Sequence, residues 1–312
     1  MLSSAILLGP QRHVPIVRAA VETLVPEARS GPLAVVTAGW EERESEEQEL
    51  REHVQRPLHN LAIWERVERI FERDPELLEA MRQRHDRLRS VQERYRLRLQ
   101  GLIGATAELL RREGDPAVLD PERQESMSML RQLDDQHVAR IAEIHREFEV
   151  LWRPHDRTSV VREKLEISRR LRDASCLMIA GGHVSVLLHR LRLFDVFGLW
   201  GDRPVIAWSA GAMVLTQRIV LFHDSPSQGN SDTEVMEAGF GLVPDVVALP
   251  HAKQRLQTED ALRVQMFARR FAPASCALLD RGSRLDWRGG RWQALPGTRR
   301  LVEDGSVVEA RP

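Results

Sequence analysis

The fold of this chain is decided by residues 203–213, which read Arg203-Pro204-Val205-Ile206-Ala207-Trp208-Ser209-Ala210-Gly211-Ala212-Met213. An apolar run that predicts a buried strand ends at Ser209, and small residues that can begin a helix follow at once. A strand, a serine and a helix in this order are typical of a nucleophile elbow, which lifts the serine hydroxyl off the edge of a sheet. Such a turn also directs backbone N–H groups to the place where an oxyanion forms. A plain loop between a strand and a helix is the alternative interpretation.

Two later apolar runs end in the residues that a serine nucleophile needs. Residues 218–222 lead through a histidine to Asp224, and residues 246–250 lead to His251. Serine is a weak nucleophile without a base, and the base needs an orienting carboxylate. Because reacting groups of an open α/β sheet gather at the C-terminal ends of its strands, we expect Ser209, Asp224 and His251 to lie at one edge.

Other residues compete for these two roles. Asp232 and Asp245 are the rival carboxylates, and His223 is the rival base. Neighbouring residues of one strand face opposite sides, so His223 and Asp224 do not readily serve the same cavity.

Four segments in combination resemble peptidase family S51, which includes aspartyl dipeptidase and cyanophycinase. They are Trp208-Ser209-Ala210-Gly211-Ala212, Ile179-Ala180-Gly181-Gly182-His183, Phe222-His223-Asp224-Ser225-Pro226, and Gly239-Phe240-Gly241-Leu242-Val243-Pro244 with Leu249-Pro250-His251. The resemblance covers residues 170–290 well and the first forty residues loosely. It implies an α/β fold with a flavodoxin-like, class I glutamine-amidotransferase-like sheet that is mostly parallel and flanked by helices.

The resemblance also implies a serine peptidase that works through an acyl-enzyme. The implied triad is Ser209 as nucleophile, His251 as base and Asp224 as orienter. The implied oxyanion hole consists of the N–H groups of Ala210, Gly181 and Gly182. Known members cleave peptide bonds next to aspartate, so the expected substrate is a small peptide or isopeptide.

The chain departs from the family pattern beside the elbow. Ala207 stands where glycine is usual, His183 where asparagine is usual, and Trp208 where a small or hydroxylated residue is usual. Ala252 replaces a common aromatic residue after His251. We expect Trp208 and His183 to line the substrate pocket, which leaves the substrate less defined than the chemistry.

Three further residues are candidates for substrate binding. Lys253 and Arg255 follow His251 closely, and either could hold a substrate carboxylate. Exposure to solvent without a ligand is the alternative for both. Trp40 follows the predicted strand 33–38 at the catalytic edge, where it could line the pocket or pack the base of an insertion.

Composition narrows the class of protein. The 312 residues carry a net charge of −1, which gives no reason to expect nucleic acid. No residue spacing typical of a metal site and no nucleotide-binding loop is evident, so we expect neither metal nor cofactor. Cys176 and Cys276 lie in predicted strands, which suits buried thiols in a reducing compartment. Without a basic leader or an apolar run of about 20 residues, we expect a cytoplasmic protein that does not enter a membrane.

The middle of the chain differs in composition from its two ends. Residues 45–145 are rich in Glu, Arg, Gln and Leu, with apolar residues at helical spacing. They predict three or four helices inserted between residues 1–44 and residues 146–312, which form the two parts of the α/β core. Turn sequences at 288–291 and 303–306 predict a small antiparallel β segment at the C-terminus.

The insertion has two possible uses. It begins where the second predicted strand ends, at the catalytic edge, which is where a lid would be attached. Long charged helices with apolar seams also commonly pair, which favours an oligomerisation arm and a homodimer. Two other functions stay open: a non-catalytic α/β scaffold whose insertion mediates protein–protein assembly, and an acyltransferase that uses the same elbow.

Overall fold

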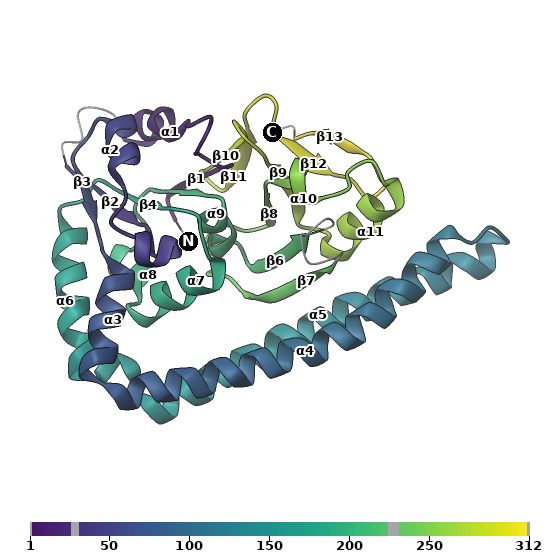
Figure 1. Cartoon of the computed structure of the whole chain (residues 1–312). Helices are drawn as coiled ribbons and strands as arrows, with labels where there is room; N and C mark the ends of the chain where they lie inside the picture. The colour runs from purple at the N-terminus through teal and green to yellow at the C-terminus, as the bar shows by residue number, and fades with distance from the viewer. Residues whose placement is uncertain (1, 26–30, 224–230, 311–312) are drawn as a thin grey trace.

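The computed structural model describes residues 2–25, 31–223 and 231–310 of the chain (Figure 1). In this part the strands form three sheets, and helices cover the largest sheet on both faces. The fold is therefore the mixed α/β type that the sequence predicts, built around a mostly parallel sheet. None of the described helices combines the length and the apolar character that crossing a bilayer needs.

Seven strands form the central sheet, in the order β11-β10-β1-β5-β4-β2-β3. Five are parallel, and β10 and β11 continue the sheet antiparallel. The strands are β1 (Ser4–Leu8), β2 (Leu33–Val36), β3 (Leu58–Asn60), β4 (Cys176–Ile179), β5 (Val205–Trp208), β10 (Arg284–Arg288) and β11 (Arg291–Ala294). Every residue of β2, β4 and β5 is buried, as expected where helices cover both faces of a parallel sheet.

The two faces of this sheet belong to separate hydrophobic cores. Along β1, Ile6 and Leu8 face α1 and α2, whereas Leu7 faces the helices of the other side. The helices of the two layers are α1 (Val17–Leu24) and α2 (Gln48–Val54) on the first face, and α3 (Ile63–Arg73), α6 (Thr158–Arg172), α7 (Val184–Leu193), α8 (Val196–Trp200) and α9 (Ala210–Leu215) on the second. Short 3₁₀ helices, η1 (Ala38–Arg43) and η2 (Pro154–Asp156), lie in the connections.

The remaining strands form two smaller sheets. β8 (Val246–Pro250) and β9 (Ser275–Leu279) are parallel, and β12 (Arg299–Leu301) and β13 (Val307–Glu309) extend them antiparallel. β6 (Arg218–His223) and β7 (Ser231–Ala238) form a hairpin. The helices α10 (Ala252–Arg255) and α11 (Ala261–Phe271) lie between β8 and β9 in the chain. The two C-terminal hairpins therefore extend existing sheets instead of forming a separate antiparallel segment.

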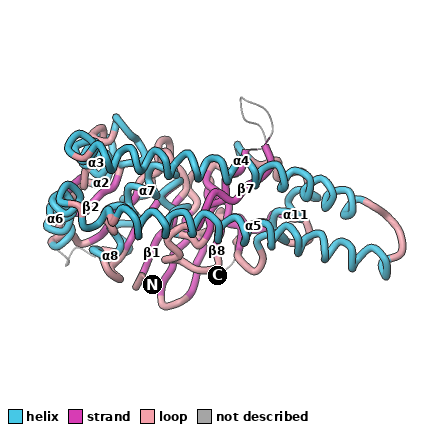
Figure 2. The backbone as a smooth tube through the Cα atoms, turned by 90° about the horizontal axis from the view of Figure 1, so that it is seen from below, coloured by secondary structure: helices cyan, strands magenta, loops and turns pink. Residues whose placement is uncertain are grey.

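Two 37-residue helices, α4 (Pro75–Arg111) and α5 (Pro116–Trp152), form a long antiparallel hairpin. The hairpin runs beside α7, β7 and α11, and its tip projects beyond the rest of the chain (Figures 1 and 2). Asp74 begins α4 by accepting a hydrogen bond from the N–H of Leu77 at 3.1 Å. Asp115 caps α5, which begins at Pro116 and continues through a second proline, Pro121.

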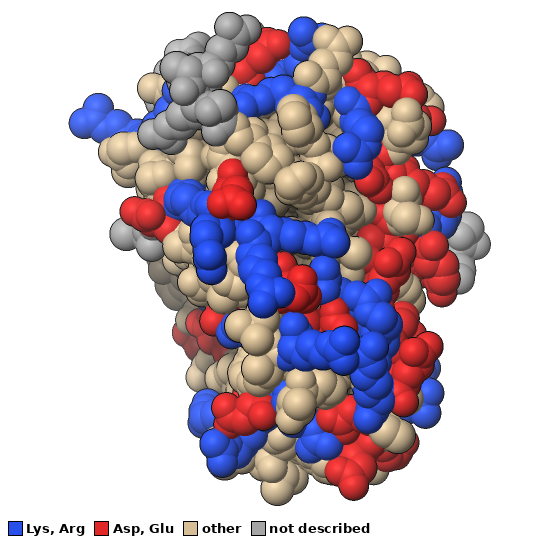
Figure 3. Space-filling view, turned by 90° about the vertical axis from the view of Figure 1, so that its left-hand side faces the viewer, with Lys and Arg blue, Asp and Glu red and all other residues tan. Residues whose placement is uncertain are grey.

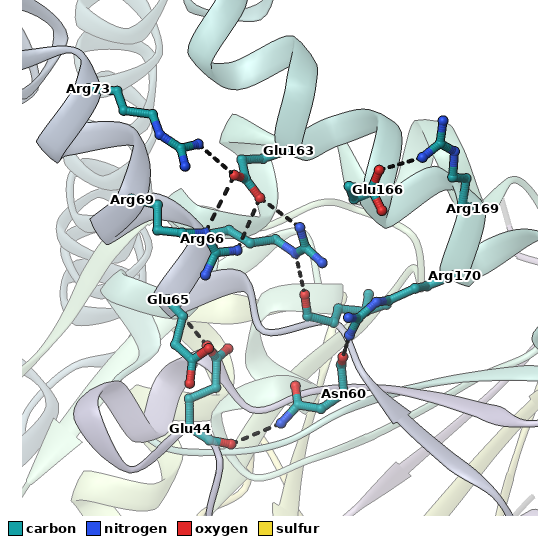
Figure 4. Close-up of polar contacts among 11 residues, drawn as sticks. Glu44, Asn60, Glu65, Arg66, Arg69, Arg73, Glu163, Glu166, Arg169 and Arg170 are labelled. Carbon is teal, nitrogen blue, oxygen red and sulfur yellow. Dashed lines mark hydrogen bonds and ion pairs between the residues drawn. The ribbon is translucent and has the colours of Figure 1, made fainter.

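A buried carboxylate marks each place where the chain leaves or rejoins the core. Glu44 accepts hydrogen bonds from the N–H groups of Trp64 and Glu65, both at 3.0 Å, and so caps α3. Glu163 on α6 lies among three arginines of α3, with contacts of 2.7 Å to Arg66, 3.1 Å to Arg69 and 3.2 Å to Arg73 (Figure 4). These ion pairs fix α3 against α6 before α4 begins.

The hairpin is anchored at a second buried ion pair. Asp134 on α5 is fully buried and receives hydrogen bonds from Arg270 on α11, at 2.6 and 2.7 Å. The hydroxyl of Tyr95 on α4 donates to the same carboxylate at 2.7 Å and accepts from the N–H of Val235 on β7 at 3.1 Å. Four elements that are distant in sequence therefore meet at one carboxylate.

We expect Asp134→Leu to lower the free energy of unfolding by about 3–5 kcal/mol, because it leaves the Arg270 guanidinium buried without its counter-charge. The double variant Asp134→Leu/Arg270→Met should lose clearly less, since no uncompensated charge remains. Urea unfolding measures both. The exposed pair of Arg87 and Glu147 provides the control, because Glu147→Gln should change stability little. A single variant as stable as the double variant would contradict this account.

Candidate active site

Ser209 lies in a sharp turn between β5 and α9. Its backbone has φ 53° and ψ −123°, a conformation with positive φ that residues other than glycine rarely adopt. Such strain costs about 1–3 kcal/mol and persists only where the surrounding structure enforces it. The N–H of Ser209 donates to the carbonyl oxygen of Leu8 at 3.1 Å, which ties the turn to the end of β1. The half-buried side chain remains in contact with solvent.

Glycines allow the neighbouring loops to approach this turn. A Cβ on Gly181 would lie 2.8 Å from the Cβ of Ser209 and 3.2 Å from its Oγ. A Cβ on Gly211 would lie 2.2 Å from the carbonyl oxygen of Ile179. The loop after β4 and the start of α9 can therefore pack on the serine only because both positions lack a side chain.

Three backbone amides, in this turn and in the loop after β4, have no protein acceptor among the described residues. In that part of the chain, the N–H groups of Gly181, Gly182 and Ala210 donate to no other residue. Ala210 is the first residue of α9, where an N–H has no acceptor within the helix. A Cβ on Gly181 would lie 3.2 Å from the Ser209 Oγ, so this loop lies against the serine. Unpaired backbone N–H groups beside a nucleophile are donors of the kind that a developing oxyanion needs.

His251 follows β8 and adopts a left-handed backbone conformation, with φ 59°. Its N–H donates at 3.1 Å to the carbonyl oxygen of Leu279, the last residue of β9, which Asp280 follows. Burial and the nearby charge of Arg255 lower the pKa of His251 below its usual value. The imidazole is therefore neutral at neutral pH and able to accept a proton.

The strands β5 and β8 belong to different sheets, but their neighbours β1 and β9 meet at their C-terminal ends. A Cβ on Gly9, which follows β1, would lie 1.7 Å from the carbonyl oxygen of Asp280. The N–H of Gly9 donates to the carbonyl oxygen of Ser283 at 3.0 Å. The two sheets thus abut at their C-terminal edges, and Ser209 and His251 lie on that common edge. No hydrogen bond joins their side chains within residues 2–25, 31–223 and 231–310.

The sequence predicted Ser209, Asp224 and His251 at one edge of one sheet, and the structure differs from this. β5, β6 and β8 belong to three different sheets, because β6 pairs with β7 and β8 pairs with β9. Asp224 lies outside the described residues. Its rival Asp245 precedes β8, at the opposite end of that five-residue strand from His251. Its rival Asp232 borders a small cavity beside Arg263 and α11.

The charge of Asp280, a residue that the sequence did not single out, acts on His251. Asp280 Oδ1 accepts the N–H of Lys253 at 2.8 Å, which holds the start of α10 against the end of β9. Asp280 could have been identified in the sequence by its position at the end of a predicted strand, as His251 was. Asp280 tends to raise the pKa of His251, although burial outweighs it.

The five residues proposed to bind substrate occupy different surroundings. Trp208 is only 5% exposed and packs with Trp40 in the core that α1 covers. His183 is exposed and caps α7, since its Nδ1 accepts the N–H of Val186 at 3.3 Å. Lys253 is exposed and Arg255 is half-buried, both on α10 close to His251.

The surface charge around α3 and α6 is mixed. Figure 3 shows this face, where Lys and Arg side chains lie beside Asp and Glu side chains. Pairs within a helix, such as Arg169 and Glu166 at 2.5 Å, account for part of the pattern (Figure 4). Such exposed pairs solvate a helix and contribute little to stability.

Comparisons with known proteins identify one matching family and two similar structures. The model of a family described as peptidase family S51 matches residues 130–295, just over half of the chain. A peptidase from an acI-B1 Actinobacterium is similar in structure, with a TM-score of 0.49, 14% identity and coverage of 99% of this chain and 95% of that chain. A protein of Listeria monocytogenes EGD-e described as a candidate peptidase E has a TM-score of 0.45, 10% identity and coverage of 97% and 100%. No curated protein matches the sequence.

We expect Gly181→Ala to displace the Ser209 side chain, because the new methyl group would lie 2.8 Å from its Cβ. Labelling of the chain by a serine-reactive fluorophosphonate should slow by about a hundredfold, the loss expected for a misplacement of about 1 Å. Gly101→Ala on α4 is the matched control, since its Cβ would meet no atom within 4 Å. Equal labelling of both variants would show that the Gly181 contact does not position the serine.

We expect the pKa of His251, followed by NMR titration of its ring protons, to lie below about 6.5. Arg255→Met should raise it, because the substitution removes the cation that disfavours the imidazolium. Lys253→Met is the control, because the exposed Lys253 charge is screened by solvent. A wild-type pKa at or above the ordinary value would contradict the burial of the ring.

Proposed function

Because this chain belongs to peptidase family S51, we propose that it is a serine-type peptidase that cleaves a small peptide or isopeptide through an acyl-enzyme. The observation that carries the proposal is the strained turn at Ser209, against which the Gly181 loop lies. A backbone held in this conformation without function would be a net loss of stability.

In the proposed reaction the Ser209 hydroxyl attacks the carbonyl carbon of the substrate. His251 takes the proton from the hydroxyl and later gives it to the leaving amine. The amides of Gly181, Gly182 and Ala210 donate hydrogen bonds to the oxyanion, each contributing about 3 kcal/mol to the transition state. Water then hydrolyses the acyl-enzyme and regenerates the serine.

The third member of the proposed triad is the carboxylate that orients His251. Asp224 carries that role by family resemblance and lies outside the described residues. Asp280 acts on His251 only through its charge, since its oxygens are engaged with Lys253 and Arg299. We therefore keep Asp224 in the role of orienter.

The substrate is proposed to carry a carboxylate near the scissile bond, as the aspartyl substrates of the family do. Arg255 is half-buried and Lys253 is exposed, and both lie close to His251 in the chain.

The resemblance to family S51 also supports a flavodoxin-like, class I glutamine-amidotransferase-like core. Free and buried, Cys176 and Cys276 support a cytoplasmic location.

The proposal includes a homodimer. At the end of α5, Val150 and Leu151 are 74% and 77% exposed. Apolar side chains this exposed and adjacent suit burial against a second copy.

We expect Ser209→Ala to fold normally and to lose at least about a thousandfold in kcat/KM. A pooled library of short peptides, including α- and β-aspartyl dipeptides, is incubated with each protein, and mass spectrometry identifies the products. Ser90→Ala on α4 is the matched control. Retention of more than a tenth of wild-type activity would remove Ser209 from the mechanism, and products joined to an acceptor other than water would favour an acyltransferase.

A further inference from the structure

A cavity of about 340 Å³ lies beneath the helical hairpin, between α5, α7 and β7. α7 begins just after the Gly181 loop, and the part of α7 that borders the cavity lies about 9 Å further along its axis. The cavity is therefore distinct from the space beside Ser209. Residues of α4 and α5 line one side of the cavity, and residues of α7 and β7 line the other.

Three potential metal ligands converge at the wall of this cavity. They are His145 on α5, His189 on α7 and Glu237 on β7. His189 Nε2 lies 2.8 Å from Glu237 Oε2, and His145 Nε2 lies 3.3 Å from Glu237 Oε1. One ligand atom from each residue lies within 4.8 Å of the other two.

We propose that His145, His189 and Glu237 bind one divalent transition-metal ion, with Zn²⁺ as the best match. Two imidazole nitrogens and one carboxylate are a donor set that Zn²⁺ prefers, whereas Mg²⁺ and Ca²⁺ prefer oxygen alone. Tetrahedral Zn²⁺ with bonds of about 2.0–2.2 Å holds its ligand atoms about 3.3 Å apart. The observed separations need only small side-chain movements to reach that geometry.

A resident cation now occupies the position between these ligands. Arg192 Nη1 contacts the Glu237 carboxylate and lies 3.3 Å from His145 Nε2. Its Nη2 donates to the carbonyl oxygen of Ala238 at 2.6 Å. The metal ion would displace Nη1 from the carboxylate while Nη2 keeps its carbonyl. Arg192 thus competes with the metal, and its removal should strengthen metal binding.

The fourth coordination position would open into the cavity. One buried donor at this cavity, Arg84 Nε, has no hydrogen-bond partner among the described residues. A buried donor without a partner costs about 1–3 kcal/mol, which an anionic fourth ligand would offset. A small carboxylate or hydroxide would satisfy such a donor and balance the charge of the metal and the two arginines.

The test begins with chelator-treated, full-length protein titrated with Zn²⁺ in a calorimeter. We expect saturable binding of one equivalent in the wild type. His145→Ala and His189→Ala should each weaken Zn²⁺ binding at least about a hundredfold, because each removes a metal ligand. Loss of a residue that only supports a ligand already costs about 10–100-fold in metal affinity. Exposed His85 on α4 provides the control variant His85→Ala, which should bind like wild type.

Arg192→Met separates a metal site from a permanent ion pair. It should bind Zn²⁺ more tightly than wild type by about tenfold or more, since the competing cation is gone. Binding by Arg192→Met alone, with none in the wild type, would overturn the proposal and leave Arg192 as the permanent partner of Glu237.

Two measurements keep the test valid if a histidine variant folds poorly. Co²⁺ added to wild type should produce the visible absorption bands of a tetrahedral ion, and Zn²⁺ should abolish them. Zn²⁺ should also raise the thermal midpoint of wild type, because the ion binds the folded state. No binding in wild type, or binding that His145→Ala leaves unchanged, would overturn the proposal. Ser209→Ala should bind Zn²⁺ normally, so this site and the peptidase proposal fail separately.

Discussion

Close backbone contact between three loops at the C-terminal edge of the central sheet is the constraint on which the site depends. Gly182 has φ 113°, and a Cβ there would lie 2.1 Å from the carbonyl oxygen of Gly39. Gly181 then lies against Ser209, and the N–H of His183 reaches the carbonyl of Gly39 at 2.7 Å. The loops after β2, β4 and β5 therefore form one rigid unit. That unit holds the serine in its strained conformation.

The long hairpin is joined to the core in a different way, through buried carboxylates. Glu163, Asp134 and Glu237 each lie at a boundary between the hairpin region and the rest of the chain. Each is surrounded by arginine or histidine side chains from another element. Removing one partner leaves an uncompensated charge, so these contacts define where the helices lie even where they add little net stability. At Glu237 the same arrangement also produces the candidate metal ligands.

Several elements could be predicted from local sequence. The apolar runs of β2, β4 and β5 predicted strands, and all three are buried in the central sheet. Strand β3 gave no comparable signal. It is three residues long and lies at the edge of the sheet, within the segment predicted to be helical. Its position depends on pairing with β2, which a local pattern does not encode.

The sequence by itself determined the mixed α/β class, the family and the position of Ser209 between a strand and a helix. Those features arise from neighbouring residues, whose periodicity and size can be read directly. Only the tertiary structure decided that β5, β6 and β8 belong to three sheets, and that Asp280 lies near His251. It alone brought His145, His189 and Glu237 together. Contacts between residues far apart in the chain depend on how separate elements pack, and no spacing in the sequence records that packing.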